Sequence, residues 1–231
     1  MNNKSIKLFL LFSLALLSTK GYSATDCADG SVNKSCVRVF VESNTGKALQ
    51  DLVVYLEPLE GQVLEKKSDA LIIHQKSKSF APYISVSQVD AKVDFVNKDD
   101  ITHHIYSAGS DNKFSFKIRA GETNSSVNFD RSTEVAMGCN IHDWMSGYLL
   151  VVNTPYFAKT DEQGYAYFDV SMLGKYNVVV WHPQMESTDH RMMREESISP
   201  NSLFSFKLEN KMAEIPLQES NDDFDFLSDY E

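Results

Sequence analysis

Short runs in which apolar and polar residues alternate recur along most of this 231-residue chain. A two-residue period puts the apolar side chains on one face of a β-strand, and turn residues separate the runs. We find no long 3.6-residue apolar period, and expect a short helix or irregular loop only at residues 184–197. The alternation predicts an all-β sandwich. Its members include Val37, Val39 and Val41; Val93 and Phe95; Phe114, Phe116 and Ile118; Val127 and Phe129; Tyr148, Leu150 and Val152; Tyr176, Val178 and Val180; and Phe204, Phe206 and Leu208.

The N-terminal region is typical of a secretory signal peptide. Lys4 and Lys7 precede an apolar run from Leu8 to Leu17, and small residues follow up to Ala24. The run is too short to span a bilayer. We therefore expect residues 1–24 to be removed and the mature protein to be soluble and periplasmic.

The remaining chain is acidic. Residues 25–231 carry 19 basic and 32 acidic side chains, a net charge of −13, which argues against nucleic acids and anionic membranes as partners. Acidic residues are concentrated at residues 218–231, which we predict to be a disordered tail because such a segment buries little apolar surface. A role for this tail in handing over metal or docking a partner is the alternative.

The chain has three cysteines, which leaves one thiol unpaired in an oxidising compartment. Cys27 and Cys36 flank a short polar loop and are the natural disulfide pair. Cys139 is then left over. An inert buried thiol is one explanation, but the histidines and the methionine around Cys139 favour metal ligation.

The candidate ligands are one thiolate, two imidazoles and one thioether. Residues 138–145 read Gly-Cys-Asn-Ile-His-Asp-Trp-Met, and a further histidine lies upstream. A mononuclear copper site that alternates between Cu(I) and Cu(II) uses this set of donors. Zinc rarely takes a thioether, and a Cys–His nucleophile would leave two of the four residues without a role. We predict one copper ion and no enzymatic activity, with ligands His103, Cys139, His142 and Met145.

The motifs around these ligands resemble those of cupredoxins. Residues 93–107 resemble the strand and loop that deliver the first histidine, and the Cys-x2-His-x2-Met spacing resembles amicyanin, whose ligand loop is shorter than that of plastocyanin. The two halves lie in the same order, 36 residues apart. The resemblance implies a Greek-key cupredoxin domain over residues 68–152. It also implies that His103, Cys139 and His142 are equatorial ligands and Met145 the axial one.

Two residues depart from the cupredoxin pattern. His104 stands where cupredoxins usually have an asparagine that braces the cysteine loop. Strand alternation points His104 away from His103, so we expect a bracing or structural role rather than ligation. Asp143 beside His142 is also unusual, and a carboxylate there would affect both the potential and docking.

The flanking segments resemble the two halves of a carboxypeptidase regulatory-like (transthyretin-like) β-sandwich. The resemblance is carried by a Thr-Asp-x-x-Gly turn at residues 160–164 and by Gly-x-Tyr at residues 174–176. Neither flank has enough strands to bury a core alone. We therefore expect residues 37–60 and 153–210 to form one discontinuous sandwich into which the cupredoxin is inserted, or against which it packs. The layout resembles periplasmic proteins labelled methylamine-utilisation-like.

These features predict a periplasmic one-electron carrier with a transient redox or copper-exchange protein partner. A copper chaperone, buffer or sensor without electron traffic is the alternative. A second group of possible soft-metal donors is more simply core filler and loop residues. This group consists of His182, Met185, His190, Met192 and Met193.

Overall fold

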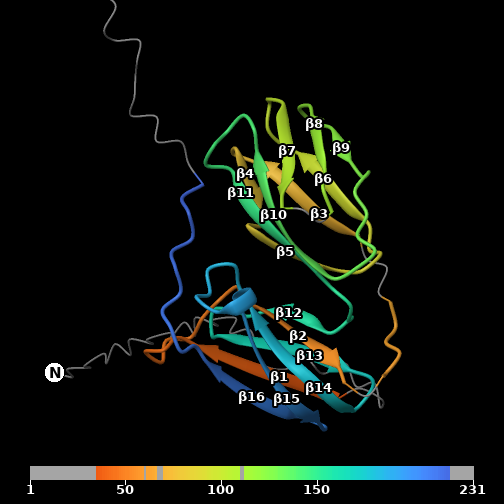
Figure 1. The fold of residues 1–231 in the computed structure, drawn as a ribbon, viewed down its shortest axis with the longest axis vertical. Coiled ribbons are helices and arrows are strands. Elements are labelled where there is room, and N and C mark those ends of the chain that lie inside the picture. Colours follow the sequence, from red (N-terminus) through yellow and green to blue (C-terminus); the bar gives the residue numbers. More distant parts are fainter. Residues whose placement is uncertain (1–34, 60, 67–69, 110–111, 219–231) are drawn as a thin grey trace, which may run out of the picture.

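The computed structural model describes residues 35–59, 61–66, 70–109 and 112–218. In this part of the chain there are sixteen strands and one short 3-10 turn at Thr188–His190, so the all-β prediction is confirmed. Among the described residues, no helix has the length and apolar character needed to cross a membrane. The strands form four sheets, arranged as two stacked sandwiches (Figure 1).

The central sandwich carries the candidate ligands. It consists of two sheets that share one core. The five-stranded sheet has the order β5-β11-β10-β7-β8, and the four-stranded sheet has the order β4-β3-β6-β9. One buried apolar cluster, which includes Phe95, Phe129 and Leu149, forms its core. The strands are β3 (Leu71–Lys76), β4 (Ser79–Ala81), β5 (Ile84–Gln88), β6 (Val93–Asn97), β7 (His103–Ala108), β8 (Ser115–Ile118), β9 (Thr123–Asn124), β10 (Thr133–Cys139) and β11 (Ser146–Val152).

The flanking sandwich combines strands that precede the central sandwich in the sequence with strands that follow it. β1 pairs with β13 and β16, and β2 pairs with β12 and β14, so the early and late segments share both sheets. Its core includes Val39, Tyr176 and Phe206. The strands are β1 (Ser35–Glu42), β2 (Val53–Pro58), β12 (Phe157–Lys159), β13 (Tyr165–Val170), β14 (Gly174–Trp181), β15 (Arg191–Ile198) and β16 (Ser202–Lys207).

Two local predictions need correction. Residues 184–197 were expected to form a short helix or irregular loop. Residues 184–190 do form a loop with the short 3-10 turn, but Arg191–Ile198 form strand β15, which pairs with β14 over its whole length. β15 is an edge strand with one face largely exposed, so its charged residues obscure the alternation. The strand expected around Val127 and Phe129 is also missing, because residues 125–132 form no strand. Phe129 is nevertheless buried in the central core, which accounts for its apolar character.

An apolar interface joins the two sandwiches. Val53, Tyr55, Val179 and Trp181 of the flanking sandwich pack with residues of β5 and β11 in a single buried cluster. The indole Nε1 of Trp181 donates a hydrogen bond of 3.0 Å to the Glu134 carboxylate of β10. The two sandwiches therefore share both buried apolar surface and a polar contact.

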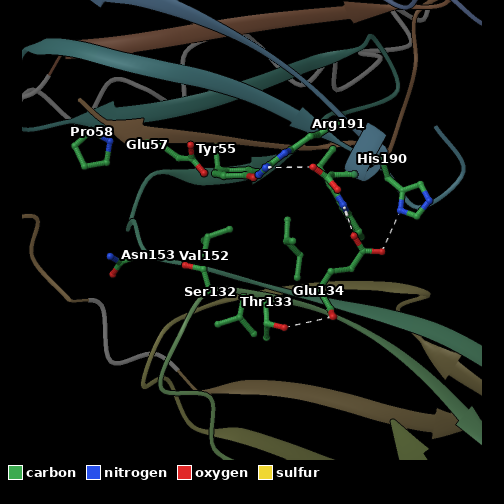
Figure 2. A pocket seen from close by; sticks show the side chains of 14 residues that line it. Tyr55, Glu57, Pro58, Ser132, Thr133, Glu134, Val152, Asn153, His190 and Arg191 are labelled. Atoms are coloured by element: carbon green, nitrogen blue, oxygen red, sulfur yellow. Dashed lines mark hydrogen bonds and ion pairs between the residues drawn. The ribbon is translucent and has the colours of Figure 1, made fainter. Parts of the chain in front are cut away.

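A cavity of about 730 Å³ opens beside this interface. Figure 2 shows Glu134 reaching toward His190, and Arg191 extending alongside Tyr55. The His190 Nδ1 lies 3.2 Å from Glu134 Oε1, and the Arg191 guanidinium lies 3.7 Å from the Asp189 carboxylate. Four of the titratable groups that line the cavity thus form two pairs.

Several terminal predictions fall outside the described residues. The signal peptide at residues 1–24, Cys27 of the predicted disulfide and residues 219–231 of the predicted tail all lie there. Gln218, which we had counted in the tail, is described. Its side chain is hydrogen-bonded to Ser146, so this residue belongs to the folded part of the chain.

The turn before β13 provides a test of the flanking sandwich. Gly164 has φ +82°, and a Cβ there would lie 2.7 Å from the Val41 carbonyl oxygen. Gly46 has φ +86°, but its nearest neighbour would be 3.9 Å away. We expect Gly46→Ala to cost about 1–2 kcal/mol in unfolding free energy, from backbone strain alone. Gly164→Ala should cost about 1–3 kcal/mol more, because β1 must also move. Denaturant unfolding measures both, and equal losses would contradict this packing.

Candidate metal centre

Strand pairing brings the candidate ligands to one end of the five-stranded sheet. His103 is the first residue of β7, and Cys139 is the last residue of β10. β10 pairs antiparallel with both β7 and β11, so the loop of residues 140–145 returns beside the start of β7. This loop carries His142 and Met145.

Three of the four predicted ligands lie close together. The Cys139 Sγ is 3.7 Å from the Nδ1 of His103 and 3.7 Å from the Nδ1 of His142. The two imidazole centroids are 5.1 Å apart. All three candidate donor atoms lie within 4.8 Å of one another, and the described part of the chain holds no other such group of three or more His, Cys, Asp or Glu residues.

These distances fit a metal ion between the three atoms. A metal bonded to nitrogen at ~2.0 Å and to thiolate sulfur at ~2.3 Å separates those two atoms by about 3.7 Å at a trigonal angle, and by about 3.5 Å at a tetrahedral angle. The observed 3.7 Å separations leave room for a metal ion bonded to both atoms of each pair. Two imidazoles and one thiolate form a donor set that suits copper.

Met145 lies in the core next to this group. Its backbone N–H donates a 3.0 Å hydrogen bond to the His142 carbonyl, which closes a turn in the ligand loop. Its side chain is buried in the same apolar cluster as Cys139. The axial ligand role of Met145 stays a prediction.

The group is shielded from solvent. His103 is fully buried, while Cys139 and His142 are 4% and 7% exposed. The pKa of His142 lies below its ordinary value, first because burial disfavours the charged ring, and then because of repulsion from His103 and Lys78. His142 is therefore neutral at pH 7, so a metal need not displace a proton from it.

Asp99 is a functional residue that the sequence analysis missed. Its carboxylate lies 2.8 Å from the His103 Nε2, and it accepts hydrogen bonds from the backbone N–H groups of Ser77 at 2.6 Å and Lys78 at 2.9 Å. Burial alone would raise the pKa of Asp99. The hydrogen bonds from Lys78, His103 and Ser77 outweigh burial and lower the pKa. An ionised Asp99 thus fixes the ring of His103 with Nδ1 toward Cys139.

Asn97 shapes the loop that connects Asp99 to His103. Its side-chain amide donates to the carbonyls of Ile101 at 2.7 Å and Ile118 at 3.1 Å. Its side-chain oxygen accepts the Asp99 backbone N–H at 2.9 Å. Asn97 is completely buried, so these bonds satisfy an amide that could not reach water.

His104 points away from the ligand group, as strand alternation predicted. Its Nε2 lies 2.9 Å from the Ser115 hydroxyl, and its Nδ1 lies 3.3 Å from the Asn140 amide nitrogen. The His104 carbonyl also accepts the Asn140 backbone N–H at 2.9 Å. His104 therefore braces the ligand loop just after Cys139. Asp143, the other departure, is exposed.

The second group of possible soft-metal donors lies in the flanking sandwich. Met192 packs against the flanking core, whereas Met193 is 59% exposed. His182 is buried, and burial lowers its pKa to about 4. None of the four predicted copper ligands lines the interface cavity, so that cavity is separate from the candidate metal centre.

Neither a protein-family model nor a curated protein sequence matches the chain. Among solved structures, a copper-containing nitrite reductase from Thermus scotoductus SA-01 is 19% identical over 48% of this chain and 28% of its own, with a TM-score of 0.34. A purple cupredoxin from Nitrosopumilus maritimus is 20% identical over 36% of this chain and 99% of its own, with a TM-score of 0.32. An oxidised amicyanin mutant is 14% identical over 43% of this chain and 98% of its own, with a TM-score of 0.34. Similarities this low carry no argument about fold or function.

The Asp99–His103 contact can be tested by removing the charge of Asp99. When Nδ1 of His103 binds a metal, its Nε2 carries the proton and donates to Asp99. Asp99→Asn puts an amide N–H against at least one of the N–H groups that Asp99 accepts from Ser77, Lys78 and His103. We therefore expect metal affinity to fall about 10–100-fold. Competition titration with Cu(II) or Co(II) measures this loss.

The neighbouring Asp100 provides the matched control. Asp100 is exposed, so Asp100→Asn removes the same charge without touching His103. Its affinity should stay within about twofold of the wild type, since surface charges contribute little. A similar loss in both variants would mean that net charge, not the orientation of His103, determines affinity.

Proposed function

We propose that this protein is a cupredoxin that binds one copper ion and carries single electrons. The observation that carries the proposal is the pair of 3.7 Å separations between Cys139 Sγ and the Nδ1 atoms of two histidines. Supporting features are the two-sheet sandwich and the ligand loop between its adjacent strands β10 and β11. We also propose that the flanking sandwich is of the carboxypeptidase regulatory-like type.

Copper bound here would supply a one-electron couple between Cu(I) and Cu(II). The protein's contribution is to hold the ligands still in both states. His103 and Cys139 belong to paired strands, and Asp99 fixes the ring of His103. Ligands held in this way move little when the charge of the metal changes, which suits fast electron transfer.

Burial of the ligands favours a carrier over a copper chaperone or buffer. A protein that hands over its metal must open its ligands to the acceptor. Here His103 is fully buried and Cys139 is 4% exposed. The same burial excludes water from the thiolate and strengthens electrostatic interactions around it. Copper exchange is the second candidate function, and the acidic composition of the chain supports it.

His142 is the proposed point of electron exit. It is the most exposed of the three clustered ligands, and its ring lies 5.3 Å from that of Trp144. The neighbouring Ile141 is 53% exposed and offers an apolar contact next to it. A redox partner would dock weakly and briefly over such a small patch. We propose that this encounter takes place in the periplasm, because residues 1–24 have the pattern of a secretory signal peptide.

Replacing the thiolate tests the copper assignment directly. Cys139→Ser should abolish any intense visible charge-transfer band, because that band requires a copper–thiolate bond. It should also abolish the rise in melting temperature on adding copper, because a ligand at 1,000 times its Kd stabilises the folded state by about 4 kcal/mol. Optical spectra and calorimetry with and without copper measure both effects. An unchanged spectrum would overturn the assignment of Cys139 as a ligand.

Replacing the thioether tests the axial assignment. Met145→Leu is close to volume-conserving, so we expect it to cost less than about 1.5 kcal/mol in stability. Because an axial thioether tunes the potential more than it holds the ion, the reduction potential should rise while copper affinity changes little. Voltammetry and a competition titration separate the two quantities. A large loss of affinity at constant potential would contradict an axial role.

A further inference from the structure

We infer that the C-terminal segment of residues 208–218 is a structural part of the metal centre, and that Gln218 positions the loop that carries Met145. We call this segment the strap. The inference rests on the proposed function, because it assigns to Gln218 an effect on bound copper. It adds a residue that lies far from the ligands in sequence and belongs to neither motif.

The strap runs from the flanking sandwich to the central one (Figure 1). It leaves β16 with Leu208, whose N–H donates to the Glu42 carbonyl at 2.9 Å. Ala213 then donates to the Gln184 carbonyl at 2.9 Å. Residues 213–217 are exposed, and the chain becomes partly buried again at Gln218. The strap therefore crosses between the sandwiches on the surface and is anchored again at its far end.

The side chain of Gln218 holds the exit of the ligand loop. Its Oε1 accepts the backbone N–H of Ser146 at 3.0 Å, and its Nε2 donates to the Ser146 hydroxyl at 2.9 Å. Ser146 directly follows Met145 and is the first residue of β11. Two bonds from one planar amide to one residue fix both its position and its direction. Met145 is thus held between the turn to His142 and the anchored Ser146.

The backbone of Gln218 contacts a second strand of the central sandwich, β4. Its carbonyl accepts a hydrogen bond of 3.0 Å from the hydroxyl of Ser79. Ser79 follows Ser77 and Lys78, both at φ +55°, whose N–H groups bind the Asp99 carboxylate. Asp99 in turn holds the His103 ring. One residue therefore ties the loop of Met145 to the turn that supports His103.

A chance contact of the C-terminal segment explains these observations less well. Ordering an exposed stretch costs conformational entropy at every residue, and specific bonds must offset that cost. Here the bonds use both polar atoms of the side chain and the backbone carbonyl, and they reach β4 and β11, which belong to different sheets of the central sandwich. The strap also links the centre to the flanking sandwich, so this sandwich contributes to the stiffness of the site.

The test compares Gln218→Ala with Leu217→Ala in the full-length protein. Leu217 is 77% exposed, so its replacement changes the same segment without touching Ser146 or Ser79. In the metal-free protein, hydrogen exchange of the Ser146 amide should speed up about tenfold in Gln218→Ala, as expected for the loss of one hydrogen bond. In the copper-loaded protein, the reduction potential should rise, because a less firmly held Met145 bonds Cu(II) more weakly. Leu217→Ala should change neither quantity.

A conservative variant separates positioning from general loosening. Gln218→Glu keeps an acceptor for the Ser146 N–H, so it should restore most of the exchange protection and most of the potential. Faster exchange in Gln218→Ala with an unchanged potential would overturn the inference, because Gln218 would then only stabilise the strap. Unchanged exchange would also overturn it. A wild-type protein without any copper-dependent band would instead overturn the proposed function, and the inference with it.

Discussion

Antiparallel pairing of β10 with β7 on one side and β11 on the other is the constraint on which the candidate metal centre depends. The register Gly138↔Ser146 makes the loop between β10 and β11 short, and Cys139↔Ile105 places the last residue of β10 near the start of β7. A shift of register by one residue would turn Cys139 to the other face of the sheet. The buried core of the central sandwich prevents that shift.

Strand pairing alone leaves the imidazole rings free to turn, and buried hydrogen bonds supply the remaining order. Asp99 holds His103 through its Nε2, while the turn at Ser77 and Lys78 holds Asp99. The hydrogen bonds from Ser77, Lys78 and His103 favour the ionised form of the Asp99 carboxylate. A ring fixed in this way presents Nδ1 to a metal without paying further ordering entropy on binding. The positive φ of Ser77 and Lys78 is a local strain that this contact offsets.

The grouping of His103, Cys139 and His142 could be predicted from sequence, because residue type and short spacing carry their chemistry. The all-β class could also be predicted, because alternation reflects burial on one face of each strand. Asp99 gave only a weak signal, a carboxylate four residues before a histidine in a polar loop. Gln218 gave none, since its partners Ser79 and Ser146 lie 139 and 72 residues away. Strand β15 was missed because a charged edge strand buries too little for alternation to appear.

The flanking sandwich and the centre are coupled more closely than a fusion of two independent units requires. Trp181 and Glu134 join them at one end of β10, and the strap joins them beside the other end, next to the ligand loop. Between these points lies the apolar cluster of Tyr55, Leu150 and Trp181. The second sandwich therefore contacts β10 at Glu134 and β11 at Leu150 and Val152, and the strap contacts β11 at Ser146. A substitution in the flanking sandwich that weakens this support would reach the ligands through β10 and β11, even though it touches none of them.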